Sequence, residues 1–513
     1  TGQLQWAINA HKEEGRRPAD LPQNGDFQHQ TMVRVYEQYE RYCARSGLVD
    51  FAELLLRTLE LFKNNEVLRA QYQRRYQHIL VDEFQDTNAI QYQWLRLLAG
   101  EAQNLFAVGD DDQSIYGWRG ARVENLLNFQ RDFPGAELIR LEQNYRSTST
   151  ILKAANAVIA HNSDRMGKEL WTDGNEGEPI VLNGASNDLE EARYVVEFIE
   201  DWLASGHAAD SVAVLYRSIA LSRVFEEKLM QAGIAYRVYG GLRFFERAEI
   251  KDALAYMRLI SNLDSDAAFE RIVNQPPRGI GNKTLEMVRQ QARSEEQSLW
   301  QASRTLISSQ GLPARAAAAV ARFLDLIASL QGEIDALELH EQTDVILARS
   351  GLLEHYRKEK GERAETRIEN LEELVNATRN YEQNEDEDEL DPLSSFIAHA
   401  ALEAGEGQAE EWESCVQLMS LHSAKGLEFP LVFMTGLEEG LFPHQRSIDE
   451  PGKLEEERRL CYVGMTRAME KLVISYAEIR RMHGREIYTQ PSRFLAEIPA
   501  SLIHEERSYR LYS

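Results

Sequence analysis

Two acidic side chains follow a short apolar run in the first fifth of the chain. Residues 79–81 read I-L-V, which is typical of a buried parallel strand, and Asp82 and Glu83 come directly after them. Open α/β sheets bind ligands at the carboxyl ends of their strands, where an aspartate can hold a Mg²⁺ that bridges two phosphates. A neighbouring carboxylate can take the proton of an attacking water. We predict a metal ligand at Asp82 and a general base at Glu83, although many surface strands also end in acids.

The residues around this pair predict a βαβ unit. Residues 88–99 place apolar side chains at helical spacing, and residues 105–108 form a second short apolar run. That run ends in a glycine, three aspartates and Gln113, whose amide suits the sensing of a terminal phosphate. Tyr116 and Trp118 come next, and aromatic faces stack on the bases of single-stranded nucleic acid without sequence preference. The alternative is that both aromatics are ordinary core or turn residues.

Five sequence blocks in this order resemble the UvrD, PcrA and Rep family of DNA helicases, in helicase superfamily one, over essentially the whole chain. The blocks are residues 82–86 (D-E-F-Q-D), 109–120 (G-D-D-D-Q-S-I-Y-G-W-R-G), 141–147 (L-E-Q-N-Y-R-S), 418–429 (L-M-S-L-H-S-A-K-G-L-E-F) and 455–468 (E-E-E-R-R-L-C-Y-V-G-M-T-R-A). The resemblance implies a motor that uses ATP and Mg²⁺ and moves 3′ to 5′ on single-stranded DNA. It also implies action at duplex junctions, alongside repair proteins, in DNA repair.

The same resemblance assigns the other nucleotide contacts. Arg146 and Arg467 match two arginines that contact phosphate, a role that suits the planar and always charged guanidinium. Tyr145 matches an aromatic that stacks on adenine, and Glu428 matches a residue that holds a ribose hydroxyl. His422 lies in the part of its block that faces DNA. Away from such blocks an arginine is usually a solvated surface residue, and the plain alternative for the histidine is a hydrogen-bonded strand end.

Two further segments are expected to contact DNA. Residues 277–285 (P-R-G-I-G-N-K-T-L) resemble a helix-hairpin-helix turn, in which Gly279 and Gly281 allow close approach and amides at the next helix start bind a phosphate. A purely structural turn is the alternative, and the family resemblance favours duplex contact. His483 stands where close relatives in the family carry a tyrosine at the fork of the separating strands. Histidine has a smaller π surface and can become charged, so we expect a weaker or different strand-separating pin.

A phosphate-binding loop is the part of such a motor that these 513 residues lack. The pattern G-x-x-x-x-G-K-[ST] does not occur, and residues 279–284 (G-I-G-N-K-T) have the wrong spacing. The chain opens at Thr1, so we expect an amino-terminally truncated helicase that is inactive alone. The alternative is a non-catalytic DNA- or partner-binding protein derived from a helicase.

Composition fits an intracellular enzyme, whereas the net charge has the wrong sign for DNA binding. The chain carries 57 basic and 83 acidic side chains, a net charge of −26. Whole-chain charge bears on solubility more than on a site, and Arg480, Arg481 and Arg485 are candidates for a local basic track. Residues 385–389 are five consecutive acids, which we expect in a solvated loop. Three cysteines without metal-ligand spacing and no long apolar run favour a reducing bacterial cytosol, near the nucleoid and away from membranes.

The order of elements predicts an α/β fold with two RecA-like parallel-sheet motor domains, the first incomplete, and all-helical insertions. Strand-like runs occur at residues 138–141, 180–182, 212–215, 416–421, 431–435 and 472–476. Helical spacing prevails between the third and fourth runs, as at 249–259, 285–292, 314–330 and 366–381, and also in the first 76 residues, as at 33–43 and 51–62. We expect residues 1–76 to be the rest of a helical insertion (1B), 77–142 the carboxyl part of the first motor domain (1A), 143–239 with 413–509 the second motor domain (2A), and 240–412 its helical insertion (2B).

Overall fold

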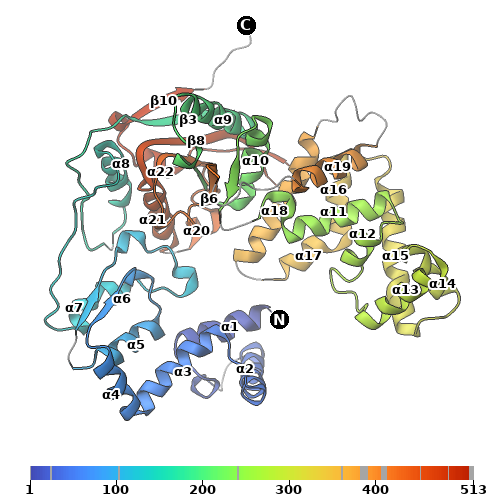
Figure 1. The fold of residues 1–513 in the computed structure, drawn as a ribbon, viewed down its shortest axis with the longest axis horizontal. Coiled ribbons are helices and arrows are strands. Elements are labelled where there is room, and N and C mark those ends of the chain that lie inside the picture. The colour runs from blue at the N-terminus through green and yellow to red at the C-terminus, as the bar shows by residue number, and fades with distance from the viewer. Residues whose placement is uncertain are drawn as a thin grey trace, which may run out of the picture. The chain divides into compact units, whose positions relative to one another are not determined.

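The computed structural model describes residues 2–22, 26–101, 104–163, 165–239, 242–359, 362–381, 391–405, 413–450, 452–482 and 485–507. Figure 1 traces the elements along the chain. Their contacts group them into two units. Unit 1 is made of Thr1–Leu182, Ala424–Val473 and Ser492–His504, and unit 2 of Asn183–Ser423, Ile474–Pro491 and Glu505–Ser513.

Four helices open unit 1, which confirms the helical expectation for the first 76 residues: α1 (Gly2–Glu13), α2 (Phe27–Ser46), α3 (Phe51–Asn64) and α4 (Glu66–Arg75). Asp26, Asp50 and Asn65 start the last three of these helices, because each side chain accepts a backbone N–H of the first turn. Lys12 of α1 is buried, and its ammonium lies 2.8 Å from Asp50 and 2.9 Å from Glu53. A buried ammonium is stable only when paired, so these contacts fix α1 against the start of α3.

The expected βαβ unit is confirmed. Strands β1 (Ile79–Val81) and β2 (Leu105–Ala107) pair in parallel, and α5 (Ala89–Ala99) connects them. The expectation that the first strand is buried is wrong, since Leu80 is 77% exposed and Phe106 of β2 is 62% exposed. Alternate strand residues face opposite sides, and only the side of Ile79 and Val81 packs on the aromatic cluster around Phe84. The strands nevertheless end side by side, which brings the residues after them together.

The second sheet has the strand order β10-β3-β8-β7-β4-β6-β5, with β9 paired to β8. Within unit 2, β4 and β5 pair in parallel with β6, and β9 pairs antiparallel with β8. The strands are β3 (Ile180–Asn187), β4 (Val212–Tyr216), β5 (Tyr236–Val238), β6 (Val416–Ser420), β7 (Phe429–Thr435), β8 (Ala468–Met482), β9 (Arg485–Tyr488) and β10 (Ile503–Arg507). Both sheets therefore contain parallel strand pairs, which confirms the predicted α/β fold with parallel sheets.

Five of the six strand-like runs are confirmed, and the run at residues 138–141 is wrong. Those residues form no strand, and Ile139 and Leu141 are 67% and 78% exposed. The first bridge to another part of the chain comes two residues later, where Gln143 forms an isolated bridge with Trp171. The short strand β5 was not expected, because its three residues, Y-R-V, carry no alternation long enough to stand out.

Helices flank the sheet strands in both units. Unit 1 contains α6 (Glu124–Leu127), α7 (Phe129–Asp132), α8 (Ser149–Ile159), α20 (Gln445–Asp449), α21 (Lys453–Met465) and α22 (Arg493–Ala496). Unit 2 contains α9 (Asp188–Ala204) and α10 (Ser222–Gln231). Among these, α21 packs on α8 and reaches the loop after β2, so it is the element that joins several of the sequence blocks.

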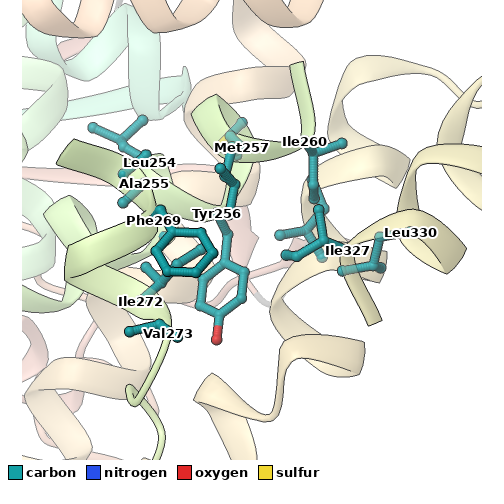
Figure 2. Close-up of a cluster of buried hydrophobic side chains, with 14 of the residues drawn as sticks. Leu254, Ala255, Tyr256, Met257, Ile260, Phe269, Ile272, Val273, Ile327 and Leu330 are labelled. Atoms are coloured by element: carbon teal, nitrogen blue, oxygen red, sulfur yellow. The ribbon is translucent and has the colours of Figure 1, made fainter. Parts of the chain in front are cut away.

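A separate helical group occupies residues 248–405 of unit 2 (Figure 1). Its helices are α11 (Ala248–Ser261), α12 (Asp266–Ile272), α13 (Asn282–Glu295), α14 (Leu299–Ser308), α15 (Ala314–Ile334), α16 (Leu339–Ser350), α17 (Leu352–Arg357), α18 (Glu362–Asn380) and α19 (Pro392–Gly405). Figure 2 shows part of its core, where Tyr256 of α11, Phe269 of α12 and Ile327 of α15 converge. The prediction of an all-helical segment here is confirmed.

The expected basic track near the carboxyl end is wrong in part. Arg480 is buried, and its guanidinium lies 2.5 Å from the carboxylate of Glu191, which is also buried. Arg481 bonds to Asn380 and forms an ion pair of 3.1 Å with Glu486. The side chain of Arg485 and residues 385–389 lie outside the described part of the chain. Arg480 thus stabilises the fold and is not available to a phosphate.

No helix in the described residues is both long and apolar enough to cross a membrane.

Candidate functional site

The turn after β1 holds its second carboxylate in an unusual backbone conformation. Glu83 has φ 50° and ψ 43°, the left-handed region that costs energy for any residue with a Cβ. Its backbone N–H donates to Asp82 at 2.9 Å, and its carboxylate accepts from the buried amide of Gln85 at 2.6 Å. The oxygen of that amide accepts the backbone N–H of Asp110 at 2.9 Å. Gln85 therefore ties Glu83 to the loop after β2.

Lys425 binds this turn from the fourth sequence block. Its ammonium lies 3.1 Å from Glu83 and 2.7 Å from Asp86, and it donates to the backbone carbonyl of Gln113 at 2.9 Å. Burial raises the pKa of the Asp86 carboxyl, while the neighbouring ammonium acts in the opposite direction. Sequence analysis missed both Lys425 and Gln85 as site residues. The only available signal was their position inside the blocks A-K-G-L-E and D-E-F-Q-D.

The carboxylates of this turn fit a divalent cation. The ammonium of Lys425 pairs with the carboxylates of Glu83 and Asp86, and Asp82 adds a third carboxylate next to Glu83 in the turn, so negative charge is in excess. One oxygen of Asp86 is buried and has no hydrogen-bond partner within the described structure. A cavity of about 370 Å³ opens beside them and is also lined by Thr87 and Trp94. Mg²⁺ prefers such hard oxygen donors, so these residues could hold the ion that the sequence predicts at Asp82.

The ligand oxygens of the three aspartates before Gln113 lie within 4.8 Å of one another, and two of these side chains pair with cations of the protein. Asp112 makes a two-pronged ion pair with Arg165, with distances of 2.6 and 2.7 Å, and Asp110 pairs with Lys168. Asp110 also accepts the side-chain amide of Gln113 at 2.7 Å. Protein cations offset Asp110 and Asp112, and Asp110 in addition fixes the orientation of the Gln113 amide.

Arg146 and Arg467 lie in one positively charged cluster. Arg467 is only 2% exposed, and its guanidinium donates to the backbone carbonyls of Val463 and Leu427 at 3.0 and 3.1 Å. Burial and, next, the charge of Arg146 lower the pKa of Arg467 to about 10, although Glu83 among other groups opposes this shift. Two guanidiniums that repel each other favour an anion between or beside them. The charges of Glu83 and Arg467 thus influence each other.

Glu428 lies 2.5 Å from the guanidinium of Arg146. The expected ribose-binding residue thus forms an ion pair with an expected phosphate-binding arginine. Both side chains are partly exposed, at 50% for the glutamate and 28% for the arginine, so a nucleotide can reach them.

Tyr145 presents its ring to solvent beside this cluster. The ring is 85% exposed, and its hydroxyl donates to the side chain of Gln143 at 2.9 Å. The amide of Gln143 in turn donates to Asp173 at 3.0 Å, while the backbone next to it pairs with Trp171. An exposed ring that is held at its hydroxyl is suited to stacking on a planar base.

Tyr116 and Trp118 form an aromatic group with Arg119, which sequence analysis did not single out. The two rings pack edge to face with centroids 6.4 Å apart. The guanidinium of Arg119 lies 4.9 Å from the tyrosine ring and 4.5 Å from the tryptophan ring. Since Trp118 is 48% exposed, this turn, named the Y-G-W turn below, offers a stacking face and a positive charge to a polynucleotide.

The remaining expected DNA contacts belong to unit 2 or lie outside the described residues. His422 is half-buried in the turn after β6. Gly279 has φ +78°, and a Cβ placed on Gly279 or Gly281 would meet no atom within 4 Å, so the turn before α13 is open. Arg278 stabilises this turn from inside by donating to the carbonyls of Ile272 and Ser350. His483 lies outside the described part of the chain.

Comparison with known proteins defines the family. Residues 1–134 match the UvrD/REP helicase N-terminal domain, and residues 139–479 match the UvrD-like helicase C-terminal domain. The chain belongs to the UvrD-like DNA helicases.

Individual relatives agree with this family. DNA helicase II of Escherichia coli is 58% identical over 98% of this chain and 70% of its own length. DNA helicase II of Haemophilus influenzae is 55% identical over 98% of this chain and 69% of its own length. ATP-dependent DNA helicase PcrA of Staphylococcus aureus is 42% identical, with the same two coverages. Among solved structures, the C-terminal domain of a possible DNA helicase from Lactobacillus matches 71% of this chain and 98% of its own at 11% identity, with a TM-score of 0.27, which is too low to bear on the fold.

Proposed function

We propose that this chain is the motor part of an ATP-dependent DNA helicase that moves 3′ to 5′ on single-stranded DNA and acts at duplex junctions in DNA repair. The observation that carries the proposal is the cluster in unit 1. Glu83, Gln113, Lys425, Arg146 and Arg467 come from different sequence blocks. Lys425 contacts Glu83 and Gln113, and the charges of Arg146 and Glu83 act on Arg467. Acidic groups that can hold a metal beside arginines that need an anion suit a nucleoside triphosphate with Mg²⁺.

Each residue of the cluster has a chemical role in this proposal. Asp82 binds Mg²⁺, and Glu83 accepts the proton of the attacking water. Gln113 senses the terminal phosphate, while Arg146 and Arg467 neutralise charge that develops on the transferring phosphoryl group.

Two more residues hold the rest of the nucleotide. Tyr145 stacks on the adenine, which its 85% exposed ring supports. Glu428 binds a ribose hydroxyl and must leave its ion pair with Arg146 to do so.

The DNA track begins at the Y-G-W turn. Tyr116 and Trp118 stack on bases of the single strand, and Arg119 adds a charge next to the backbone phosphates. We assign His422 to the same strand, and the open turn at Gly279 and Gly281 to the duplex, whose phosphates would meet the amides of α13. His483 remains our candidate for the strand-separating pin.

We also propose the domain division 1–76 (1B), 77–142 (1A), 143–239 with 413–509 (2A) and 240–412 (2B). The parallel pairing of β1 with β2, and of β4 and β5 with β6, supports two motor domains. The helical core at residues 244–400 supports an insertion. As a relative of DNA helicases the protein would act in the bacterial cytosol on nucleoid DNA, together with repair proteins.

A phosphate-binding loop decides whether this chain turns over ATP. The 513 residues contain no G-x-x-x-x-G-K-[ST] pattern, so we expect purified residues 1–513 to show no ATPase activity above that of a buffer control. A hybrid that joins a phosphate-loop segment of a UvrD-type helicase to residue 1 should hydrolyse ATP and be stimulated by single-stranded DNA. A hybrid that binds single-stranded DNA without hydrolysing ATP would favour the alternative, a non-catalytic binding protein derived from a helicase.

Trp118→Ala should weaken binding of single-stranded DNA about tenfold, because one base-stacking contact contributes roughly 1 to 3 kcal/mol. Fluorescence anisotropy of a labelled oligothymidine with residues 1–513 measures this change. Trp171→Ala is a matched control, since Trp171 is 47% exposed and Trp118 is 48% exposed. Equal affinities of Trp118→Ala and the unmodified chain would remove Trp118 from the DNA track.

A further inference from the structure

Glu456, in the first turn of α21, reaches across the chain to the Y-G-W turn. Its carboxylate accepts the backbone N–H of Gly117 at 3.1 Å, although 339 residues separate the two positions. Gly117 lies between Tyr116 and Trp118 and begins the short helical turn Gly117–Arg119. A hydrogen bond to this amide therefore restrains both aromatic side chains of the proposed DNA track.

The carboxylate of Glu456 lies close against Gly117, where no side chain intervenes. A Cβ at that position would lie 3.0 and 3.2 Å from the two carboxylate oxygens of Glu456, closer than nine in ten real Cβ contacts, so the carboxylate would have to move by a few tenths of an ångström. The carboxylate is half-buried, and burial raises its pKa although the Gly117 N–H opposes the shift. A carboxylate that is partly removed from water and bound to one backbone amide is a directed contact and not a solvated surface charge.

The same helix leads to Arg146 and Arg467, the two arginines proposed to bind phosphate. Arg467 follows the last residue of α21 by two positions, and its guanidinium donates to the carbonyl of Val463 in that helix. Tyr462 of α21 packs against Lys168, which pairs with Asp110, the residue that orients Gln113. Helix α21 thus carries Glu456 in its first turn, against the Y-G-W turn, and its last turn accepts a hydrogen bond from Arg467, which follows the helix.

We propose that Glu456 is a positioning residue that couples the two sites: it holds the Y-G-W turn in its DNA-stacking conformation and links that turn, through α21, to Arg467. The proposal rests on the proposed function, because it assumes that Trp118 stacks on DNA. A shift of α21 when the arginines grip a triphosphate would then move or release the stacking face. DNA bound to the Y-G-W turn would in the same way bias the position of Arg467.

Substitution of Glu456 in residues 1–513 tests the hydrogen bond directly. Glu456→Ala should lower affinity for labelled oligothymidine about tenfold, the lower end of the loss expected for a hydrogen bond to a charged partner. It should also speed hydrogen exchange of the peptide that contains the Gly117 amide. Glu456→Gln keeps an oxygen acceptor at the same place and should restore both affinity and protection to within about twofold. A role in folding alone would change the melting temperature without this pattern of rescue.

Glu455→Ala is the matched control, because it removes a neighbouring acid of the same helical turn whose carboxylate contacts Ser163 at 3.2 Å and not Gly117. Gly117→Ala is the second arm if Glu456→Ala does not fold. Its Cβ should push the carboxylate away and lower DNA affinity to a similar extent.

These experiments separate the role of Glu456 from the role of Trp118 in binding DNA. Unchanged DNA affinity and unchanged exchange in Glu456→Ala, with Trp118→Ala weakened as expected, would overturn the role of Glu456 alone. Equal losses in Glu456→Ala and Glu456→Gln would also overturn it, because the acceptor would then be irrelevant. No effect of Trp118→Ala would overturn the DNA track and, with it, this proposal.

Discussion

Glu83→Gln is expected to lower the ATPase rate of the hybrid at least about 100-fold and to leave its affinity for single-stranded DNA within about twofold. Removing a general base typically costs a factor of 10² to 10⁴ in rate. The amide keeps the size of the carboxylate and can still bond to Gln85, so the strained turn should remain in place. Steady-state phosphate release and oligothymidine anisotropy measure the two quantities.

Glu137→Gln is the control for this substitution, because Glu137 is exposed and belongs to none of the five sequence blocks. Losses of similar size in hydrolysis and DNA binding would indicate misfolding or a wrong assignment of the base. Normal hydrolysis in Glu83→Gln would exclude Glu83 as the base altogether.

Arg467→Ala is expected to have an effect at least as large, about 1,000-fold on the ATPase rate. An arginine that stabilises charge on the transferring phosphoryl group is worth 10³ to 10⁵ in rate. Arg467 is only 2% exposed, so its guanidinium is already placed and loses little freedom when a phosphate binds. Arg467→Lys should recover only part of the rate, since an ammonium keeps the charge but not the planar fork.

Arg122→Ala supplies the matched control for the loss of an arginine in unit 1. Arg122 is 49% exposed and pairs with Glu14 at 3.4 Å, a surface contact of small energetic value. Because Arg467 is buried, the melting temperature of each variant must be measured with its rate. A rate for Arg467→Ala that matches that of Arg122→Ala would remove Arg467 from the reaction.

The arrangement of elements could be predicted from the sequence where the local pattern was strong. The run at residues 79–81 and the helix after it gave the βαβ unit, and long helical spacing gave the insertion. The apolar run at residues 138–141 failed, because a few apolar residues cannot tell a strand from an exposed extended segment. The exposure of Leu80 was missed for a related reason, since the pattern says nothing about which face of a short sheet is covered.

The candidate site was predicted less completely, because contacts between distant parts of the chain leave no local pattern. Lys425 and Glu83 lie 3.1 Å apart although several hundred residues separate them. Gln85 and Glu456 act through hydrogen bonds to single groups, and glutamine and glutamate at such positions look like any polar residue. Arg480 shows the opposite error. It was predicted to contact DNA because it lies next to other basic residues in the sequence, but it is the buried partner of Glu191.

The central claim is that Glu83 and Arg467 act on one and the same triphosphate. A double-mutant cycle on the ATPase rate of the hybrid, built from Glu83→Gln, Arg467→Ala and the combined variant, tests this most directly. Residues that serve one transition state are strongly non-additive, so we predict that the combined variant is within about tenfold of the slower single variant. A combined loss equal to the product of the two single losses would contradict a shared site.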